Sequence, residues 1–230
     1  MQDQAQKIFI VIPAFNEEAV IESVIREIQN HNYTHLIVVD DGSSDKTAEK
    51  SASLENVITL RHKINRGKGA ATKTGIEAAK LLDADIIVTI DGDGQHDPAN
   101  IKNLIKPLLQ KQTDVTLGTR LLDSAGMPYY KIIHNKIGNF ITWYLFGLWV
   151  TDSQSGFRAY SRKAAEKINT LGDRYEYESE VIREIYIHKL TFQEIPINVR
   201  YTDYSMNKSQ KQNFCNGIKT VGKMLWKIFA

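Results

Sequence analysis

Cysteine is nearly absent from this chain of 230 residues, which contains only Cys215. One cysteine excludes an internal disulfide framework and is typical of proteins that work in a reducing compartment. An excess of charge of one sign is also lacking, because the formal net charge is only +2. We therefore expect no nucleic-acid partner, since a polyanion-binding protein usually carries a strong basic excess.

A long hydrophobic run is missing as well. The longest apolar stretch covers residues 137–150 and contains Asn139 and Thr142, whereas a membrane-spanning helix needs about 20 apolar residues. Met1 is followed by polar residues rather than by the apolar core of a signal peptide. The sequence therefore predicts a cytoplasmic protein without a membrane span.

The composition that remains is that of an ordinary globular protein, with 42% hydrophobic and 24% charged residues. Short apolar runs alternate with segments of helical periodicity, which predicts an α/β fold with a mostly parallel central sheet covered by helices on both faces. We expect strands at 8–12, 36–39, 57–60, 85–90, 115–118 and 192–200. We expect helices after residue 17, at about 68–82, 101–110 and 177–188, within 131–150, and from about 161.

Polar loops follow three of these expected strands. Asp91 and Asp93, separated by Gly92, come directly after residues 85–90, and Asp40 and Asp41 come after residues 36–39. The first strand leads into residues 13–18, PAFNEE. In an open α/β sheet, ligands bind at the carboxyl ends of the strands, where these loops converge. Paired carboxylates suit a hard cation such as Mg²⁺ or Mn²⁺. An acidic turn without a ligand is the alternative for each loop taken alone.

Basic residues lie at further strand and helix ends. Lys68 opens a helix, where free backbone N–H groups favour phosphate. Arg120 follows the strand at 115–118, and Asp152 and Arg158 flank a polar loop. Solvated surface charges are the alternative interpretation of these positions. His96, beside the acidic pair, either takes part in the site or is structural.

Several established motifs are absent. The glycines around Lys68 lack the third glycine of a dinucleotide-binding fingerprint, and no GxxxxGK[ST] phosphate loop occurs. A Gly-x-Ser-x-Gly nucleophile elbow is absent too. These absences argue against a nicotinamide-dependent oxidoreductase, a P-loop enzyme and a serine hydrolase.

The C-terminal residues 206–230 contain no Asp or Glu. Lys219, Lys223 and Lys227 recur at a spacing of four, and apolar residues recur on another face from Phe214 onward. This pattern predicts a basic amphipathic helix, which either lies on an anionic membrane surface or packs on the core or a partner subunit.

Six motifs occur together in a fixed order. They are residues 11–17 (VIPAFNE), 39–47 (VDDGSSDKT), 65–69 (NRGKG), 91–96 (DGDGQH), 118–120 (GTR) and 155–158 (SGFR). Over residues 8–200 the chain resembles the family-2 glycosyltransferases of GT-A fold, especially those of the polyprenyl-phosphate or dolichyl-phosphate mannosyltransferase type. The resemblance implies a three-layer α/β sandwich in one domain, 1–205, with a nucleotide-sugar half at 1–120 and an acceptor half at 121–205.

The resemblance also implies roles for individual residues. The nucleotide-sugar would be held by Pro13, Phe15, Glu17, Asp40, Asp41, Lys68, Asp91, Gly92 and Asp93. The metal, Mg²⁺ or Mn²⁺, would be surrounded by Asp91, Asp93 and Gln95, and an acceptor phosphate would be met by Arg120, Arg158 and Arg200. Asp93, Arg120, Asp152 and Arg158 are the expected catalytic residues, with Asp152 as the base if the acceptor is a hydroxyl group.

Three functions remain open from the sequence. The first is an inverting transferase, peripheral on the cytoplasmic face of a membrane, that moves a sugar from GDP-mannose or a UDP-sugar to a polyprenyl phosphate. The second is a family-2 transferase that uses a hydroxyl group of a polysaccharide or another acceptor. The third is a nucleotide-sugar-binding subunit without turnover in a membrane-protein complex. Homo-oligomerisation is left open. Residues 200–208 depart from the basic, glycine-rich segment of the family, which bears on the acceptor side.

Overall fold

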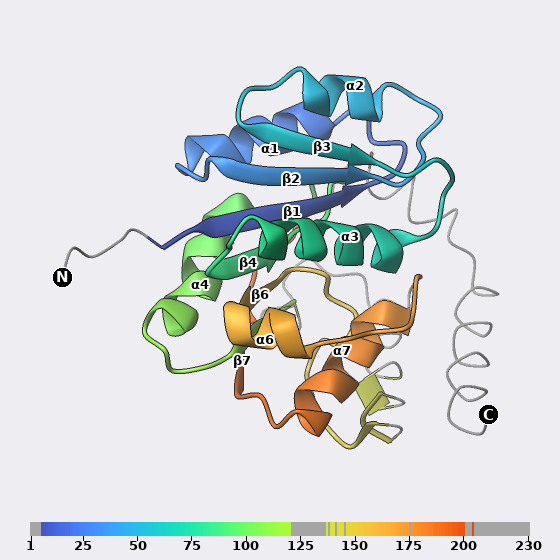
Figure 1. Ribbon diagram of the computed structural model, residues 1–230. Helices are drawn as coiled ribbons and strands as arrows, with labels where there is room; N and C mark the ends of the chain where they lie inside the picture. The colour runs from blue at the N-terminus through green and yellow to red at the C-terminus, as the bar shows by residue number, and fades with distance from the viewer. Residues whose placement is uncertain are drawn as a thin grey trace.

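The computed structural model describes residues 6–120, 137, 139–140, 142–144, 146–174, 176–200 and 204. Its centre is a seven-stranded sheet in the order β3-β2-β1-β4-β6-β5-β7 (Figure 1). The strands are β1 (Ile8–Ala14), β2 (His35–Asp40), β3 (Val57–Arg61), β4 (Ile86–Thr89), β5 (Val115–Thr119), β6 (Arg158–Ser161) and β7 (Phe192–Pro196). The predicted mostly parallel sheet is confirmed.

Only β6 runs against the other strands of the described sheet. It pairs antiparallel with β4 on one side and with β5 on the other, whereas β1, β2, β3 and β4 pair in parallel, as do β5 and β7. The sequence analysis missed β6 and placed residue 158 in a loop that leads directly into a helix. Four residues are too few to show a strand periodicity, and the backbone partners of β6 lie far away in the sequence.

Helices cover both faces of the sheet, which gives the expected three layers (Figure 1). On one face, α1 (Ile21–Asn30), α2 (Thr47–Ala52) and α4 (Ile101–Leu109) cover the strands; a short 3₁₀ turn, η1 (Pro98–Asn100), precedes α4. On the other face lie α3 (Lys68–Leu81), α6 (Arg162–Lys167) and α7 (Glu176–Ile187). Two hydrophobic cores result, one on each side of the sheet.

The last expected strand is shorter than predicted. β7 ends at Pro196, and the chain then leaves β5 and crosses to the loop after β4. There Val199 forms an isolated antiparallel bridge with His96, and the backbone N–H of Arg200 donates to the carbonyl oxygen of Gln95 at 2.7 Å. The backbone N–H of Ile197 still donates to the carbonyl oxygen of Thr119 at the end of β5, whereas Val199 and Arg200 bond to the loop after β4 rather than to the sheet.

Within the part of the chain that the structure describes, no helix combines the length and the apolar character needed to cross a bilayer. The helix predicted for residues 206–230 lies outside the described residues. Most of the segment predicted as helix at 131–150 does too, although the described residues 137, 139–140, 142–144 and 146 are helical.

Candidate nucleotide-sugar site

The loops after β1, β2 and β4 meet at one edge of the sheet because these three strands are parallel neighbours. The backbone N–H of Asp41 donates to the carbonyl oxygen of Ala14 at 2.8 Å, which joins the loop after β2 to the end of β1. A Cβ atom on Gly92 would lie 3.1 Å from the carbonyl oxygen of Pro13, so the acidic loop also packs closely against β1. The structure thus brings together the three loops predicted to form the site.

Asp40 and Asp41 are both buried. Asp41 accepts hydrogen bonds from the backbone N–H groups of Arg66 and Gly67 at 3.0 and 2.7 Å, and its Oδ1 lies 2.7 Å from Nδ1 of His62. It therefore fixes the loop that leads into α3. Asp40 accepts from the backbone N–H of Ser43 and pairs with Arg61 at 3.0 Å.

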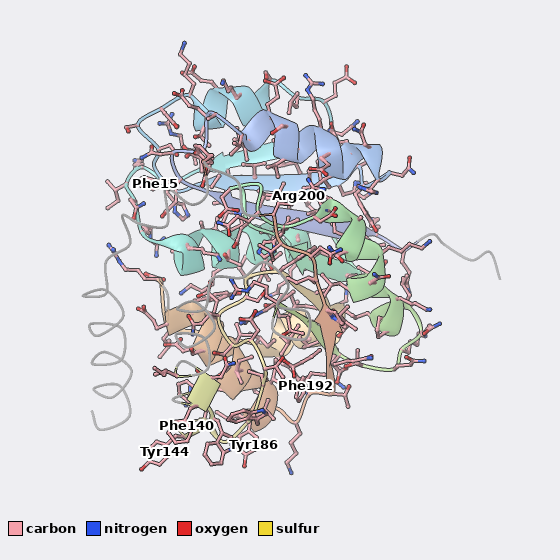
Figure 2. All side chains as sticks on the ribbon, turned by 180° about the vertical axis from the view of Figure 1, so that it is seen from behind. Phe15, Phe140, Tyr144, Tyr186, Phe192 and Arg200 are labelled. Carbon is pink, nitrogen blue, oxygen red and sulfur yellow. The ribbon has the colours of Figure 1, made fainter. Side chains whose placement is uncertain are left out.

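The loop after β1 contains one exposed and one buried candidate. Phe15 is 39% exposed and lies at the edge of the molecule in Figure 2. Glu17 is buried, and its backbone N–H donates to Oγ1 of Thr47 at 2.8 Å. The phenol of Tyr204 donates to Oε2 of Glu17 at 2.8 Å. Burial and the neighbouring Glu17 carboxylate raise the pKa of Tyr204 well above its usual value. Tyr204 was not among the predicted site residues.

Asp91 contacts the side chains of Lys68 and His96. Nζ of Lys68 lies 2.7 Å from Oδ1 of Asp91, and Nε2 of His96 lies 3.4 Å from Oδ2. Burial alone would raise the pKa of Asp91, but Lys68 and His96 reverse this effect and hold the pKa far below its usual value. Burial would likewise lower the pKa of Lys68, but the carboxylates of Asp91 and Glu178 keep it above its ordinary value. Asp91 is therefore ionised and Lys68 is charged at neutral pH.

Asp93 and Gln95 form a compact turn. Asp93 accepts from the backbone N–H of Gln95 at 3.0 Å and from its side-chain amide at 2.7 Å. Among the described residues no three His, Cys, Asp or Glu side chains cluster as a metal site. Two carboxylates and an amide oxygen nevertheless suit Mg²⁺ or Mn²⁺, which keep several coordination positions for water and for substrate phosphates. The residues present fit such an ion if the Gln95 amide turns its oxygen toward it.

Arg120 and Asp152 form a tight pair at the end of β5. Nε and Nη2 of Arg120 lie 2.7 and 2.8 Å from the two oxygens of Asp152, and the backbone N–H of Arg120 donates to the same carboxylate at 3.1 Å. The Asp152 side chain is fully buried, whereas that of Arg120 is 22% exposed. The Arg120 side chain is therefore partly accessible to solvent, whereas the Asp152 side chain is not.

Arg158 and Arg200, predicted to contact the acceptor, lie in different surroundings. Arg158 is 1% exposed and donates to the backbone carbonyls of Ser153, Ser155 and Glu178, so it holds the loop before β6 in place. Arg200 pairs with Glu27 at 2.7 Å and with Asp97 at 3.1 Å. Each arginine thus has protein partners of its own.

Sequence reasoning also missed residues whose partners are distant in the chain. Glu178 on α7 contacts Lys68 at 3.2 Å. His62, expected to be structural or on the surface, contacts Asp41 and lies 3.0 Å from Oγ1 of Thr74 through its other nitrogen. No short motif contains these pairs, and only the packing of α3 and α7 on the same face of the sheet could have indicated the first.

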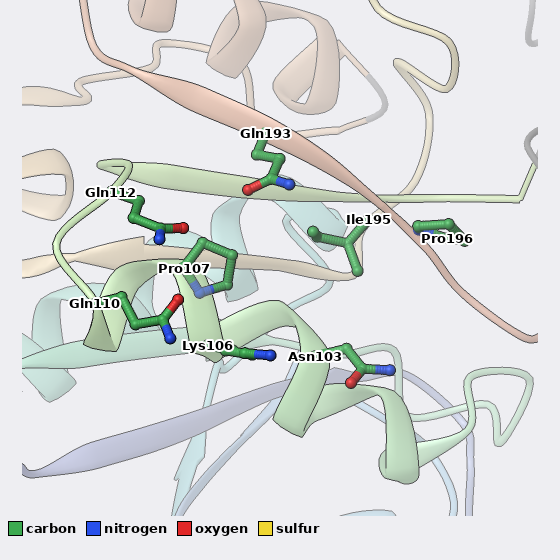
Figure 3. Close-up of a pocket in the computed structure, with 8 residues that line it drawn as sticks. All are labelled: Asn103, Lys106, Pro107, Gln110, Gln112, Gln193, Ile195 and Pro196. Atoms are coloured by element: carbon green, nitrogen blue, oxygen red, sulfur yellow. The ribbon is translucent and has the colours of Figure 1, made fainter.

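A separate pocket of about 440 Å³ lies between α4 and β7 (Figure 3). It is lined by Asn103, Lys106, Pro107, Gln110, Gln112, Gln193, Ile195 and Pro196. None of the predicted site residues belongs to it, so this pocket is distinct from the candidate site.

Solved structures with the same architecture define the class of the fold. Glucosyl-3-phosphoglycerate synthase from Mycobacterium tuberculosis, crystallised with Mn²⁺, UDP and phosphoglyceric acid, superposes with a TM-score of 0.68 at 22% identity, over 96% of this chain and 78% of that chain. Mannosyl-3-phosphoglycerate synthase from Rubrobacter xylanophilus gives a TM-score of 0.65 at 15% identity, over 96% of this chain and 74% of that chain. The fold is the GT-A fold of nucleotide-sugar-dependent glycosyltransferases.

The sequence comparison is more specific than the fold. The model of the family described as glycosyl transferase family 2 matches residues 9–169, and the chain belongs to this family. It is 38% identical to the UDP-N-acetylglucosamine–dolichyl-phosphate N-acetylglucosaminyltransferase of Methanococcus voltae, over 95% of this chain and 94% of that protein. An uncharacterised protein of Methanocaldococcus jannaschii is 44% identical over 97% of this chain and 93% of its own length. The polyprenol monophosphomannose synthase of Mycolicibacterium smegmatis is 26% identical over 71% of this chain and 65% of its own length.

Proposed function

We propose that this protein is an inverting glycosyltransferase that moves a sugar from a nucleotide-sugar to a polyprenyl phosphate at a membrane surface. The observation that carries the proposal is the close packing of the loop of Asp91 and Asp93 against the end of β1, where a Cβ on Gly92 would lie 3.1 Å from the Pro13 carbonyl. This packing supports a site in which the predicted diphosphate and metal residues lie beside the predicted nucleoside loop. The similarity to a dolichyl-phosphate transferase over nearly the whole chain supports the lipid acceptor.

A phosphate acceptor fits the state of Asp152. The oxygen of a lipid phosphate is already anionic near neutral pH and needs no general base, whereas a hydroxyl acceptor needs one. Asp152, the predicted base, is buried and accepts three hydrogen bonds from Arg120. The phosphate oxygen would attack the anomeric carbon as the bond from that carbon to the donor diphosphate breaks, which inverts the configuration. Arg120, partly exposed at the end of β5, would meet the acceptor phosphate.

On the donor side, Asp91, Asp93 and Gln95 would hold Mg²⁺ or Mn²⁺, which neutralises charge on a departing nucleoside diphosphate. Lys68 would add a positive charge at the start of α3, where free backbone N–H groups also favour phosphate. Phe15 would contact the base and Glu17 the ribose. UDP-N-acetylglucosamine is the first donor to test, because the Methanococcus relative is named for it; GDP-mannose and UDP-glucose follow.

The test is transfer by the purified full chain with Mn²⁺, a short polyprenyl phosphate and each radiolabelled donor. We expect one donor to give an organic-extractable glycolipid of inverted anomeric configuration. Asp93→Asn should lower the transfer rate by about a hundredfold or more, since it weakens the hold on the cation that would neutralise the departing diphosphate. Asp173→Asn is the matched control, because this carboxylate pairs with Lys73 and Arg66 and is not a predicted ligand of the cation.

The other hypotheses give different results in the same assay. Transfer only to soluble sugar hydroxyls would favour a hydroxyl acceptor over a lipid phosphate. Donor binding without transfer or donor hydrolysis would favour a nucleotide-sugar-binding subunit without turnover. Equal rates for Asp93→Asn and Asp173→Asn would show that the acidic loop does not do the chemistry proposed here.

A further inference from the structure

Glu178, in the first turn of α7, reaches the candidate site although no sequence motif includes it. Its side chain is 3% exposed, and its Oε1 lies 3.2 Å from Nζ of Lys68. The same nitrogen lies 2.7 Å from Oδ1 of Asp91. Lys68 therefore bridges two carboxylates, one on the loop after β4 and one on α7.

The bridge is closely confined. A Cβ atom on Gly156 would lie 2.5 Å from Nζ of Lys68 and 2.8 Å from Oδ1 of Asp91, so the backbone of the loop before β6 covers the ion pair directly. The other oxygen of Glu178, Oε2, is buried without a hydrogen-bond partner among the described residues. A buried carboxylate that is only partly paired is costly, so its presence in a native site calls for an explanation.

The charges around Lys68 suggest that explanation. Asp91 is a predicted ligand of the divalent cation, and a cation and the Lys68 ammonium compete for the same carboxylate because both are positive. An ammonium displaced from Asp91 without another partner would be a buried, unpaired charge beside a second positive charge. Glu178, which already contacts the ammonium at 3.2 Å, offers such a partner.

We infer that Glu178 is a positioning residue that retains Lys68 when Asp91 turns from the ammonium to the cation. Lys68 then stays paired and buried at the start of α3, within reach of a donor diphosphate. This inference rests on the proposed function, since both require a divalent cation at Asp91 and Asp93.

The test is Mn²⁺ binding by the full chain, measured by electron paramagnetic resonance with and without UDP. Glu178→Gln keeps the size of the side chain and removes its charge, so Lys68 is left with Asp91 as its charged partner. We expect Mn²⁺ to bind about tenfold more weakly or worse. Glu176→Gln is the matched control, since Glu176 is a buried acid of the same helical turn and should change Mn²⁺ affinity by less than about twofold.

Replacing Lys68 separates this mechanism from a general effect of charge. A general loss of negative charge would weaken Mn²⁺ binding with or without the ammonium, whereas a positioning role requires the ammonium, so Glu178→Gln should change Mn²⁺ affinity by less than about twofold in the Lys68→Met background. In the otherwise unaltered chain, Lys68→Met should raise Mn²⁺ affinity, and this single variant tests the inference even if Glu178→Gln fails to fold. Equal Mn²⁺ affinities for the unaltered chain and Glu178→Gln would overturn the inference, as would the same loss of affinity from Glu178→Gln with and without Lys68. Failure of the unaltered chain to bind Mn²⁺, even with UDP, would instead overturn the proposed function and the inference together.

Discussion

The carboxylate of Asp152 shows how one residue can fix the end of a strand. It is fully buried and accepts three hydrogen bonds from Arg120, at 2.7, 2.8 and 3.1 Å. Arg120→Ala would leave this charge buried without its partner, which typically costs about 3–5 kcal/mol. Because Arg120 is 22% exposed, water can replace part of its hydrogen bonding to Asp152. We therefore expect the free energy of unfolding to fall by an amount near the lower end of this range, about 3 kcal/mol. Urea unfolding followed by tryptophan fluorescence measures the loss.

Two further variants control that experiment. Arg120→Lys keeps the charge but not the planar, two-pronged geometry, so its stability should lie between those of Arg120→Ala and the unaltered chain. Arg26→Ala removes an exposed pair with Glu22 one helical turn away, and it should cost less than about 1 kcal/mol. Equal losses for Arg26→Ala and Arg120→Ala would contradict the importance assigned to the buried pair.

Asp114 gives a pH prediction. Partial burial raises its pKa, but hydrogen bonds from Lys163 and Thr191 outweigh this effect and lower the pKa below its ordinary value. A lowered pKa in the folded state means that the carboxylate contributes stability above its unfolded pKa of about 4, and that this contribution disappears as the pH falls through the folded value. The stability advantage of the unaltered chain over Asp114→Asn should therefore be constant near neutral pH and shrink in acid. Urea unfolding of both proteins between about pH 7 and pH 3 measures this stability difference. A difference that stays constant over this range would contradict the lowered pKa of Asp114.

At the scale of residues, the sequence predicted the site where a motif was local. Asp91, Asp93 and Gln95 lie in one short loop, and Asp40 and Asp41 in another, so the strand ends and the order of the motifs were enough to bring them together. The partners of these residues could not be predicted. Glu178 reaches Lys68 only because α7 packs beside α3, and His62 reaches Asp41 across a strand and a loop. Tertiary packing decides such contacts, and a single sequence does not record it.

The contact between α3 and β1 is an element-scale feature with a sharp test. A Cβ atom on Gly75 would lie 2.3 Å from Cγ1 of Val11, so the helix approaches the buried strand as closely as a glycine allows. In an exposed helix, replacing Gly by Ala stabilises the fold by about 1 kcal/mol. Adding atoms to a well-packed core instead destabilises the fold by about 1–3 kcal/mol. We expect Gly75→Ala to lower the free energy of unfolding by about 1 kcal/mol on balance.

A second substitution checks that the clash is the cause. Val11→Ala removes the methyl group that the new Cβ would meet, so Gly75→Ala should be neutral or stabilising in that background. Urea unfolding of the four proteins of this double-mutant cycle gives the coupling energy. The same loss from Gly75→Ala in both backgrounds would show that the helix position does not depend on Val11.

The element scale also shows which parts of the fold a sequence records. β1, β2 and β4 are apolar runs bounded by polar loops, and α1 and α4 repeat apolar residues every three or four positions, so their existence was predicted and only their bounds shifted. β6 has four residues and lies between two strands that it opposes in direction. Its place depends on the gap between β4 and β5, which no local pattern contains. Residues 197–200 were predicted as strand for the opposite reason, because the alternation of apolar residues continues beyond Pro196, where β7 ends.

At the scale of the whole molecule, exposed aromatic side chains gather at one end. Phe140, Tyr144 and Tyr186 lie together there in Figure 2, each more than half exposed. The ring of Trp143 lies 5.7 Å from that of Phe140 and 6.0 Å from that of Trp149, measured between ring centroids. Trp149 is in turn three residues before Asp152, which pairs with Arg120 in the candidate site. The aromatic end is thus joined by a short loop to the predicted acceptor side.

Trp and Tyr prefer the boundary between lipid and water, where the ring is buried and its polar atom stays hydrated. An enzyme that takes its acceptor from a bilayer would place such residues near the acceptor side, and this gives the last prediction. Replacing Phe140 and Tyr144 together by Ser removes most of two aromatic surfaces, so partition onto polyprenyl-phosphate-containing vesicles should fall by about tenfold or more. Vesicle sedimentation measures this partition.

The control for the vesicle experiment is a pair of exposed aliphatic residues elsewhere, Ile64 and Leu81, replaced by Ser in the same way. These residues lie at opposite ends of the segment that contains α3, outside the aromatic end, so their loss should leave vesicle binding nearly unchanged. Equal reductions for both double variants would mean that binding follows total exposed apolar area rather than this surface. If the double variant of Phe140 and Tyr144 bound vesicles as well as the unaltered chain, the aromatic end would not contribute to membrane binding. The acceptor would then have to reach Arg120 by another route.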